Sequence, residues 1–201
     1  MYQVNHVMKL DGKKFYDISV WNMFGRQKML AVMLLIIYTI GLGFVVTALP
    51  ALKEGQTNSF IINAGIGIIM LVMGGYLLYG NLNRLKKISR NEEHLAKTEK
   101  HIKMDESQIT NYRVSVSEQV SYQWKQVVGI YDRPEEIVLC MKDKQILVLE
   151  KDKLQKEELQ FIKAKADVLG LWKKSVSIKL WAVIAAVIGL FMIAAGVSVF
   201  L

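Results

Sequence analysis

Long apolar blocks without charged residues dominate the hydropathy pattern of this chain. They cover residues 29–49, 60–79 and 180–201. Each block is about 20 residues long, and a helix of that length, at about 1.5 Å per residue, spans roughly 30 Å, the thickness of a bilayer's hydrocarbon core. The pattern therefore predicts three transmembrane helices.

The first two blocks predict a transmembrane hairpin over residues 29–79. Their connection, residues 50–59, is short and rich in turn-forming residues. Small residues such as Gly41 and Gly67 let membrane helices approach closely. The third block also carries small residues at four-residue spacing. Its packing face meets either the hairpin of the same chain, which we favour, or a second copy of the protein.

Residues 1–28 predict a cytoplasmic N-terminal segment that contains a short amphipathic helix. Its apolar residues recur about every third position: Phe15, Ile18, Trp21 and Phe24. Aromatic rings favour the headgroup level, so this stripe either lies in the membrane interface or packs on the cytoplasmic domain. A cleavable signal peptide is disfavoured, because its apolar core is usually about 7–15 residues long and follows a short basic leader.

The pattern changes after the second apolar block. Residues 80–98 are polar and contain no helix breaker, which predicts a helical linker. Residues 99–170 then predict a small α+β domain, because strand-like alternation replaces the helical period. Turn signals separate the expected strands, so the sheet should be antiparallel. The strands are expected near residues 108–116, 120–125, 137–141 and 146–149.

A helix is expected at the end of this domain, over residues 153–169. Asp152 lies at its predicted N-cap and Gln155 lies three residues further on. Its apolar face would cover the sheet. Trp124 shares strand parity with Val120 and Tyr122, so we expect its side chain to anchor the core of the domain.

Charge predicts the orientation of the chain in the membrane. The net charge is +8, and basic residues flank the apolar blocks, whereas the first connection contains only Lys53. Cytoplasmic flanks carry an excess of Lys and Arg, so the N-terminus and the sheet domain should be inside and Leu201 outside. Anionic phospholipid headgroups are the expected ligands of a basic collar, which comprises Arg84, Lys86, Lys87, Arg90, Lys173, Lys174 and Lys179.

No residue pattern indicates catalysis, a cofactor or a metal. His94 and His101 could share a helix face, but a tight metal site needs three or four ligands. Cys140 lies in a predicted strand without a nearby His, so a packing role is expected. The apolar blocks lack Asp, Glu, Lys, Arg and His, the groups that ion-coupled carriers use.

A more specific expectation comes from a family resemblance. Residues 121–131, SYQWKQVVGIY, resemble the Trp-x-x-(Ile/Val) turn and following strand of the YcxB-like family of bacterial membrane proteins. Residues 145–150, followed by Lys151, are similar to that family's strand before a capped helix. The resemblance implies a pleckstrin-homology-like (PH-like) cytoplasmic domain, a bent sheet with a C-terminal helix across one end. The third apolar block departs from the family's simplest pattern of two membrane helices.

These observations favour a non-enzymatic, multi-pass protein of the bacterial cell membrane. We expect it to present its PH-like domain to an unidentified protein partner and to anionic phospholipid headgroups, and not to nucleic acid. The alternative is a scaffold or accessory subunit of a membrane enzyme or transport complex.

Overall fold

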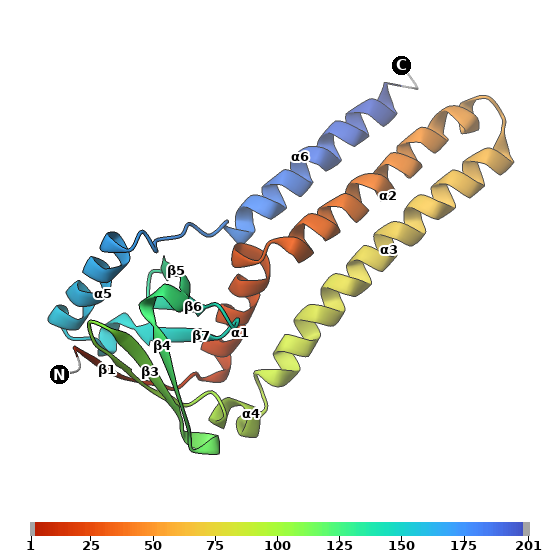
Figure 1. Cartoon of the computed structure of the whole chain (residues 1–201). Coiled ribbons are helices and arrows are strands. Elements are labelled where there is room, and N and C mark those ends of the chain that lie inside the picture. Colours follow the sequence, from red (N-terminus) through yellow and green to blue (C-terminus); the bar gives the residue numbers. More distant parts are fainter. Residues whose placement is uncertain (1–2, 199–201) are drawn as a thin grey trace. The chain divides into compact units, whose positions relative to one another are not determined.

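The structure, a computed structural model, describes residues 3–198 (Figure 1). The chain divides into two compact units. We call them the sheet unit, which comprises residues up to 16 and 88–175, and the helix unit, which comprises residues 17–87 and those from 176 onward. Each unit is therefore assembled from two segments that lie far apart in the sequence.

The sheet unit contains two antiparallel sheets followed by a helix, which agrees with the architecture expected from the sequence. The four-stranded sheet has the order β1 (Val4–Met8), β2 (Lys100–Met104), β3 (Gln108–Arg113) and β4 (Glu118–Gln123). The three-stranded sheet has the order β5 (Val127–Asp132), β6 (Glu136–Met141) and β7 (Ile146–Glu150). The helix α5 (Lys156–Val168) follows the last strand.

Short helical turns complete this unit. The helix α4 (Glu92–Ala96) precedes β2, and the 3₁₀ turns η2 (Val114–Val116), η3 (Trp124–Gln126) and η4 (Lys151–Lys153) follow β3, β4 and β7. The expected core residue Trp124 begins η3 and is 5% exposed. Its indole N–H donates a 2.9 Å hydrogen bond to the carbonyl of Asp105, and its ring meets Phe161 of α5 edge-on. Trp124 therefore packs the turn that connects the two sheets against helix α5.

Strand β1 extends the sheet beyond the predicted range of residues 99–170. Its register places Val4 opposite Met104 and Met8 opposite Lys100. Val4, His6 and Met8 are buried, whereas the residues between them are exposed. The N-terminal segment therefore supplies an edge of the sheet, although the first two apolar helices separate it from β2 in the sequence.

Two side chains of β1 accept hydrogen bonds from backbone N–H groups on the outer edge of β7. The imidazole Nε2 of His6 accepts a 3.5 Å hydrogen bond from the N–H of Glu150, and the sulfur of Met8 accepts a 3.2 Å hydrogen bond from the N–H of Val148. The buried carboxylate of Glu150 forms ion pairs with Lys14 and Lys153. These contacts attach the N-terminal segment to the second sheet.

Helix α5 begins later than the sequence indicated. Gln155, not Asp152, is its N-cap, and Gln155 and Glu158 form a reciprocal capping box. Asp152 lies in the preceding 3₁₀ turn. The sequence pattern favoured Asp152 because Asp is a preferred N-cap residue and Gln is not, but the reciprocal bonds of Gln155 and Glu158 form the cap instead.

The helix unit contains three helices that are long and apolar enough to cross a membrane: α2 (Met29–Lys53), α3 (Thr57–Ile88) and α6 (Ile178–Val197). The N-terminal helix α1 (Gly12–Trp21) passes from the sheet unit into this unit and continues as the π-helix η1 (Asn22–Arg26). The amphipathic stripe is largely buried at Ile18, Trp21 and Phe24.

Small residues make the contacts between the long helices. A Cβ atom added to Gly67 of α3 would lie 2.5 Å from the carbonyl oxygen of Gly41 in α2. Helix α6 packs along α2, where Gly189 lies against Tyr38 and Gly196 against Leu49. The small-residue face of the third helix therefore meets the same chain, as favoured from the sequence.

Three boundaries differ from the sequence-based ranges. Helix α2 continues through Pro50, since the carbonyl of Pro50 still accepts a 3.0 Å hydrogen bond from Glu54, and residues 54–56 alone connect α2 to α3. The predicted helical linker, residues 80–98, is interrupted at 89–91, between α3 and α4. The third helix begins at Ile178, and residues 199–201 of its predicted range lie outside the described residues.

Candidate functional site

The directions of the long helices bring three chain segments to one end of the helix unit. Helix α3 runs antiparallel to α2, since Gly74 meets Ile37 and Gly67 meets Gly41. Helix α6 runs parallel to α2, since its successive contacts move from Tyr38 to Leu49. The start of α2, the end of α3 and the start of α6 therefore lie at the same end (Figure 1).

Basic residues gather at this end, which we call the basic end. It comprises Arg26, Lys28, Arg84, Lys86, Lys87 and Lys179. All except the half-buried Arg26 are exposed, and Arg26 donates a 3.0 Å hydrogen bond to the side chain of Asn22. The opposite end carries Lys53 together with Glu54, whose charges cancel. The charge of the helix unit is therefore strongly asymmetric along the helix axes.

The predicted collar is divided between the two units. Arg84, Lys86 and Lys87 occupy the last turns of α3, and Lys179 lies in the first turn of α6. Arg90, Lys173 and Lys174 belong to the sheet unit, where all three side chains are exposed. Within the sheet unit, the N–H of Lys173 donates a 2.9 Å hydrogen bond to Ile130 of β5. The structure therefore brings together four of the predicted residues with Arg26 and Lys28.

Aromatic side chains accompany the basic end. Tyr76 and Tyr79 precede the basic cluster of α3 and are 75% and 67% exposed. Trp181 lies in the first turn of α6, and its indole N–H donates a 3.0 Å hydrogen bond to the carbonyl of Phe24. Tyr and Trp side chains combine an apolar ring with a polar edge, and they favour the boundary between water and lipid.

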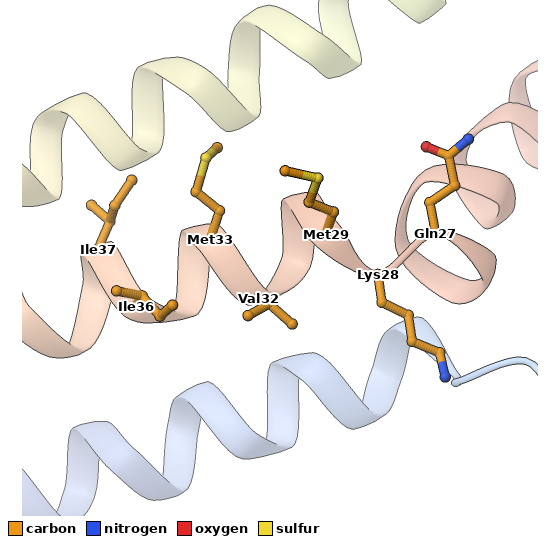
Figure 2. A pocket seen from close by; sticks show the side chains of 7 residues that line it. All are labelled: Gln27, Lys28, Met29, Val32, Met33, Ile36 and Ile37. Carbon is orange, nitrogen blue, oxygen red and sulfur yellow. The ribbon is translucent and has the colours of Figure 1, made fainter.

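An apolar hollow of about 420 Å³ lies on α2 beside the basic end. Figure 2 shows Met29, Met33 and Ile37 turned toward α3, and Lys28 and Val32 turned toward α6. Among the described residues that line it, Lys28 alone is charged. The hollow offers apolar contacts next to a single ammonium group and contains no nucleophile or acid–base pair.

The candidate metal and nucleophilic residues are placed apart. His94 lies in α4 with its ring 5.6 Å from that of Phe15, whereas His101 lies in β2 with its ring 6.2 Å from that of Tyr112. Within residues 3–198, no three His, Cys, Asp or Glu side chains gather as metal ligands would. Cys140 is fully buried in β6, which confirms its expected packing position.

Perturbed ionisable groups occur in the sheet unit. Burial and the neighbouring Arg113 lower the pKa of Lys100, which lies directly opposite Arg113 in the sheet. Burial and a 2.9 Å hydrogen bond to Asp143 raise the pKa of Tyr122 to about 12. Burial lowers the pKa of His6, and the nearby Glu150 opposes this effect only in part. His6 and Tyr122 thus form hydrogen bonds with their neighbours, whereas Lys100 faces the like charge of Arg113.

Arg26 and Lys28 were not singled out as site residues from the sequence, although they directly precede the first apolar block. The orientation of α6 was needed to group them with Lys179. No family model, no curated protein and no solved structure matches the chain.

Proposed function

We propose that this chain is a non-enzymatic, multi-pass membrane protein whose basic end lies at the cytoplasmic face and which presents the sheet unit there as an interaction domain. The observation that carries the proposal is the charge asymmetry of the helix unit. Arg26, Lys28, Arg84 and Lys179 mark one end of three apolar helices, and Lys53 and Glu54 mark the other. An excess of Lys and Arg favours retention on the cytoplasmic side.

Helix lengths support the same assignment. Helix α3 has 32 residues and is therefore roughly 48 Å long at about 1.5 Å per residue. The hydrocarbon core is roughly 30 Å thick, so the last turns of α3 project beyond it. Those turns carry Arg84, Lys86 and Lys87. Their positive charges are suited to anionic phospholipid headgroups, each contact contributing about 1 kcal/mol.

The sheet unit supports a PH-like interaction domain. Two antiparallel sheets followed by the helix α5 are compatible with the bent sheet and C-terminal helix that the resemblance to the YcxB-like family implies. The perturbed groups His6 and Tyr122 form hydrogen bonds with Glu150 and Asp143, and Lys100 lies opposite Arg113 in the sheet. Binding of a protein partner at the bacterial membrane therefore fits this unit better than catalysis.

A topology experiment tests the proposal. A reporter that is active only in the cytosol should be active when fused before residue 1 and silent when fused after Leu201. Neutralising Arg84, Lys86, Lys87 and Lys179 to Gln should lower the fraction of chains with this orientation. The matched control replaces Lys125, Lys142, Lys156 and Lys163 of the sheet unit with Gln. A reporter that is equally active at both ends contradicts the three-span topology.

One observation favours a second candidate, an accessory subunit of a membrane complex. Only 6% of the central apolar window of α3 is buried, and a Cβ atom added to Gly65, Gly75 or Gly80 would meet nothing within 4 Å. This bare helix face could pack against a helix of another subunit. Crosslinking in native membranes distinguishes the candidates, since an enzyme or transporter recovered at fixed stoichiometry through α3 favours the second.

A further inference from the structure

A polar hollow of about 550 Å³ lies where the four-stranded sheet passes into the three-stranded sheet. Its lining comprises Ser121, Gln123, Lys125, Gln126 and Lys142. Most of these residues belong to residues 121–131, the segment that carries the family resemblance. All of them lie in the sheet unit.

Backbone contacts hold the two lysines of the hollow near one another. Lys125 lies in the turn η3, next to the buried Trp124. The N–H of Lys142 donates a 2.9 Å hydrogen bond to the carbonyl of Gln126. The two ammonium groups therefore extend from chain segments that are fixed to each other, although residues 126–141 separate them in the sequence.

The capping box of η3 determines which amide atoms remain free. The side-chain oxygen of Gln126 accepts a 2.7 Å hydrogen bond from the N–H of Gln123, and the side chain of Gln123 accepts one from the N–H of Gln126. Both amide oxygens are thus engaged by the backbone. Each Gln keeps its NH₂ group as a donor.

The hollow is consequently rich in donors and lacks a negative charge. No carboxylate lines it, and within residues 3–198 neither Lys125 nor Lys142 forms an ion pair. The nearest acid in the sequence, Asp143, accepts hydrogen bonds from the Tyr122 hydroxyl at 2.9 Å and from the Gln145 N–H at 3.1 Å. Two ammonium groups and two amide NH₂ groups remain to bind a ligand, whereas the Ser121 hydroxyl shares a 3.5 Å hydrogen bond with the hydroxyl of Thr110.

We propose that this hollow binds a phosphate group that carries two negative charges. Two lysines match that charge, and their ammonium groups together with the two amide NH₂ groups match the many acceptor oxygens of a tetrahedral anion. A planar carboxylate is better matched by the fork of an Arg side chain, which the lining lacks. A nucleic-acid strand is not favoured, because no aromatic side chain lines the hollow for base stacking.

The phosphate can belong to a soluble phosphate ester or to a lipid with a phosphomonoester headgroup. The test uses the full chain in nanodiscs and measures acetylation of individual lysines by mass spectrometry. One arm adds inorganic pyrophosphate to phosphatidylcholine nanodiscs. The other arm includes phosphatidic acid in the bilayer. Selective protection of Lys125 and Lys142 in the first arm identifies a soluble ligand, and in the second arm a lipid.

Calorimetric titration with pyrophosphate provides a second measurement. Replacing either Lys125 or Lys142 with Gln should weaken binding about tenfold, since each removes one charge-assisted contact. The matched control, Lys156→Gln with Lys163→Gln, changes two exposed lysines of α5 and should leave the affinity unchanged. Equal losses in both sets, or no protection of Lys125 and Lys142 in either arm, would overturn the proposal.

Discussion

The sheet unit and the three long helices bury opposite kinds of residues. In the sheet unit, large side chains such as Ile102, Leu139 and Leu149 are fully buried. In the three long helices, the buried residues are small: Ala31, Gly41, Ala48, Gly67, Gly189 and Gly196. Large apolar side chains of these helices instead point outward, as Val72 and Phe191 do at 65% and 79% exposure.

This difference shows which solvent each unit suits. In water, burying large apolar side chains supplies the main driving force for folding. In lipid, apolar side chains gain little by leaving their surroundings, and close packing through small residues holds helices together. The sheet unit therefore has the pattern of a domain in water, and the three long helices have a pattern compatible with a bilayer.

The largest expected effect comes from a cavity-forming substitution in the hydrophobic core of the sheet unit. Trp124→Ala should lower the free energy of unfolding of the sheet unit by about 3–5 kcal/mol, because it removes a buried aromatic ring and leaves a cavity. Cys140 provides the measurement, since this single thiol is fully buried in β6. Its alkylation in the full chain should become more than about a hundredfold faster.

Val116→Ala is the matched control, because Val116 is 60% exposed in η2 of the same unit. We expect the alkylation rate of this variant to stay close to the wild-type rate. If Trp124→Ala protects Cys140 as well as the wild type does, Trp124 is not an anchor of the core.

The contrast between the units also explains what the sequence could predict. Charge-free blocks are a strong signal, so the three long helices were expected close to their observed ranges. The five residues of β1 are too few to establish a period, and their partner strand is remote in sequence. Strand β2 was missed because Lys100, His101 and Lys103 obscure the two buried positions, Ile102 and Met104.

The candidate sites were predicted less completely than the fold. Local charge found the basic residues at the end of α3, because they directly follow an apolar block. It could not divide the collar between the two units, which depends on tertiary contacts. The donors of the polar hollow were also hidden, because the freedom of the Gln123 and Gln126 amide groups follows from a reciprocal capping box.

A substitution at the close contact between α2 and α3 tests whether small residues hold the long helices together. Gly67→Leu should disrupt the crossing of α2 and α3 at a cost of about 1–3 kcal/mol, because an added Cβ would lie 2.5 Å from a backbone oxygen. A disulfide reports this crossing. A Cβ atom at Gly74 would lie 4.0 Å from that of Ile37, within the range of about 3.5–4.5 Å that a disulfide requires.

The double variant Ile37→Cys with Gly74→Cys should therefore form an intrachain disulfide under mild oxidation. Adding Gly67→Leu should reduce its yield. Adding Gly65→Leu should not, because a Cβ at Gly65 meets nothing within 4 Å. Equal yields in the two triple variants would show that α2 and α3 do not depend on this close approach.

The smallest expected effect concerns the attachment of β1 to β7. There the sheet unit buries two ionisable side chains, His6 and Glu150. His6 accepts a hydrogen bond from the Glu150 N–H and therefore must be neutral at Nε2. The groups that influence it are Glu150, Lys153, Glu158 and Asp152. Burial lowers the pKa of His6 in the folded state below the ordinary 6.5. The unfolded chain thus binds the proton more readily, and stability falls as the pH decreases below about 6.5.

Glu150 acts in a lower pH window. Burial alone would raise its pKa, but hydrogen bonds from Lys14 and Lys153 outweigh that effect and lower it below the ordinary 4.5. Its stabilising contribution is present above that value and is lost as the pH falls through the folded-state pKa. Both His6 and Glu150 therefore lower the stability of the sheet unit as the pH falls. His6 acts below about pH 6.5, and Glu150 acts below about pH 4.5.

His6→Gln distinguishes the two contributions, because a Gln oxygen accepts a hydrogen bond but does not titrate. Between pH 7 and pH 5.5, the wild type should lose about 0.5–1.5 kcal/mol of stability, the size of one hydrogen bond, and the variant should lose less. The measurement is the alkylation rate of Cys140 divided by its rate in denaturant at the same pH, which removes the intrinsic pH dependence of the thiol.

His101→Gln is the matched control, since His101 is exposed on the opposite face of the same sheet. The stability of this variant should depend on pH as that of the wild type does. A loss on acidification that His6→Gln leaves unchanged would place the proton at another group and remove His6 as the contact that joins β1 to β7.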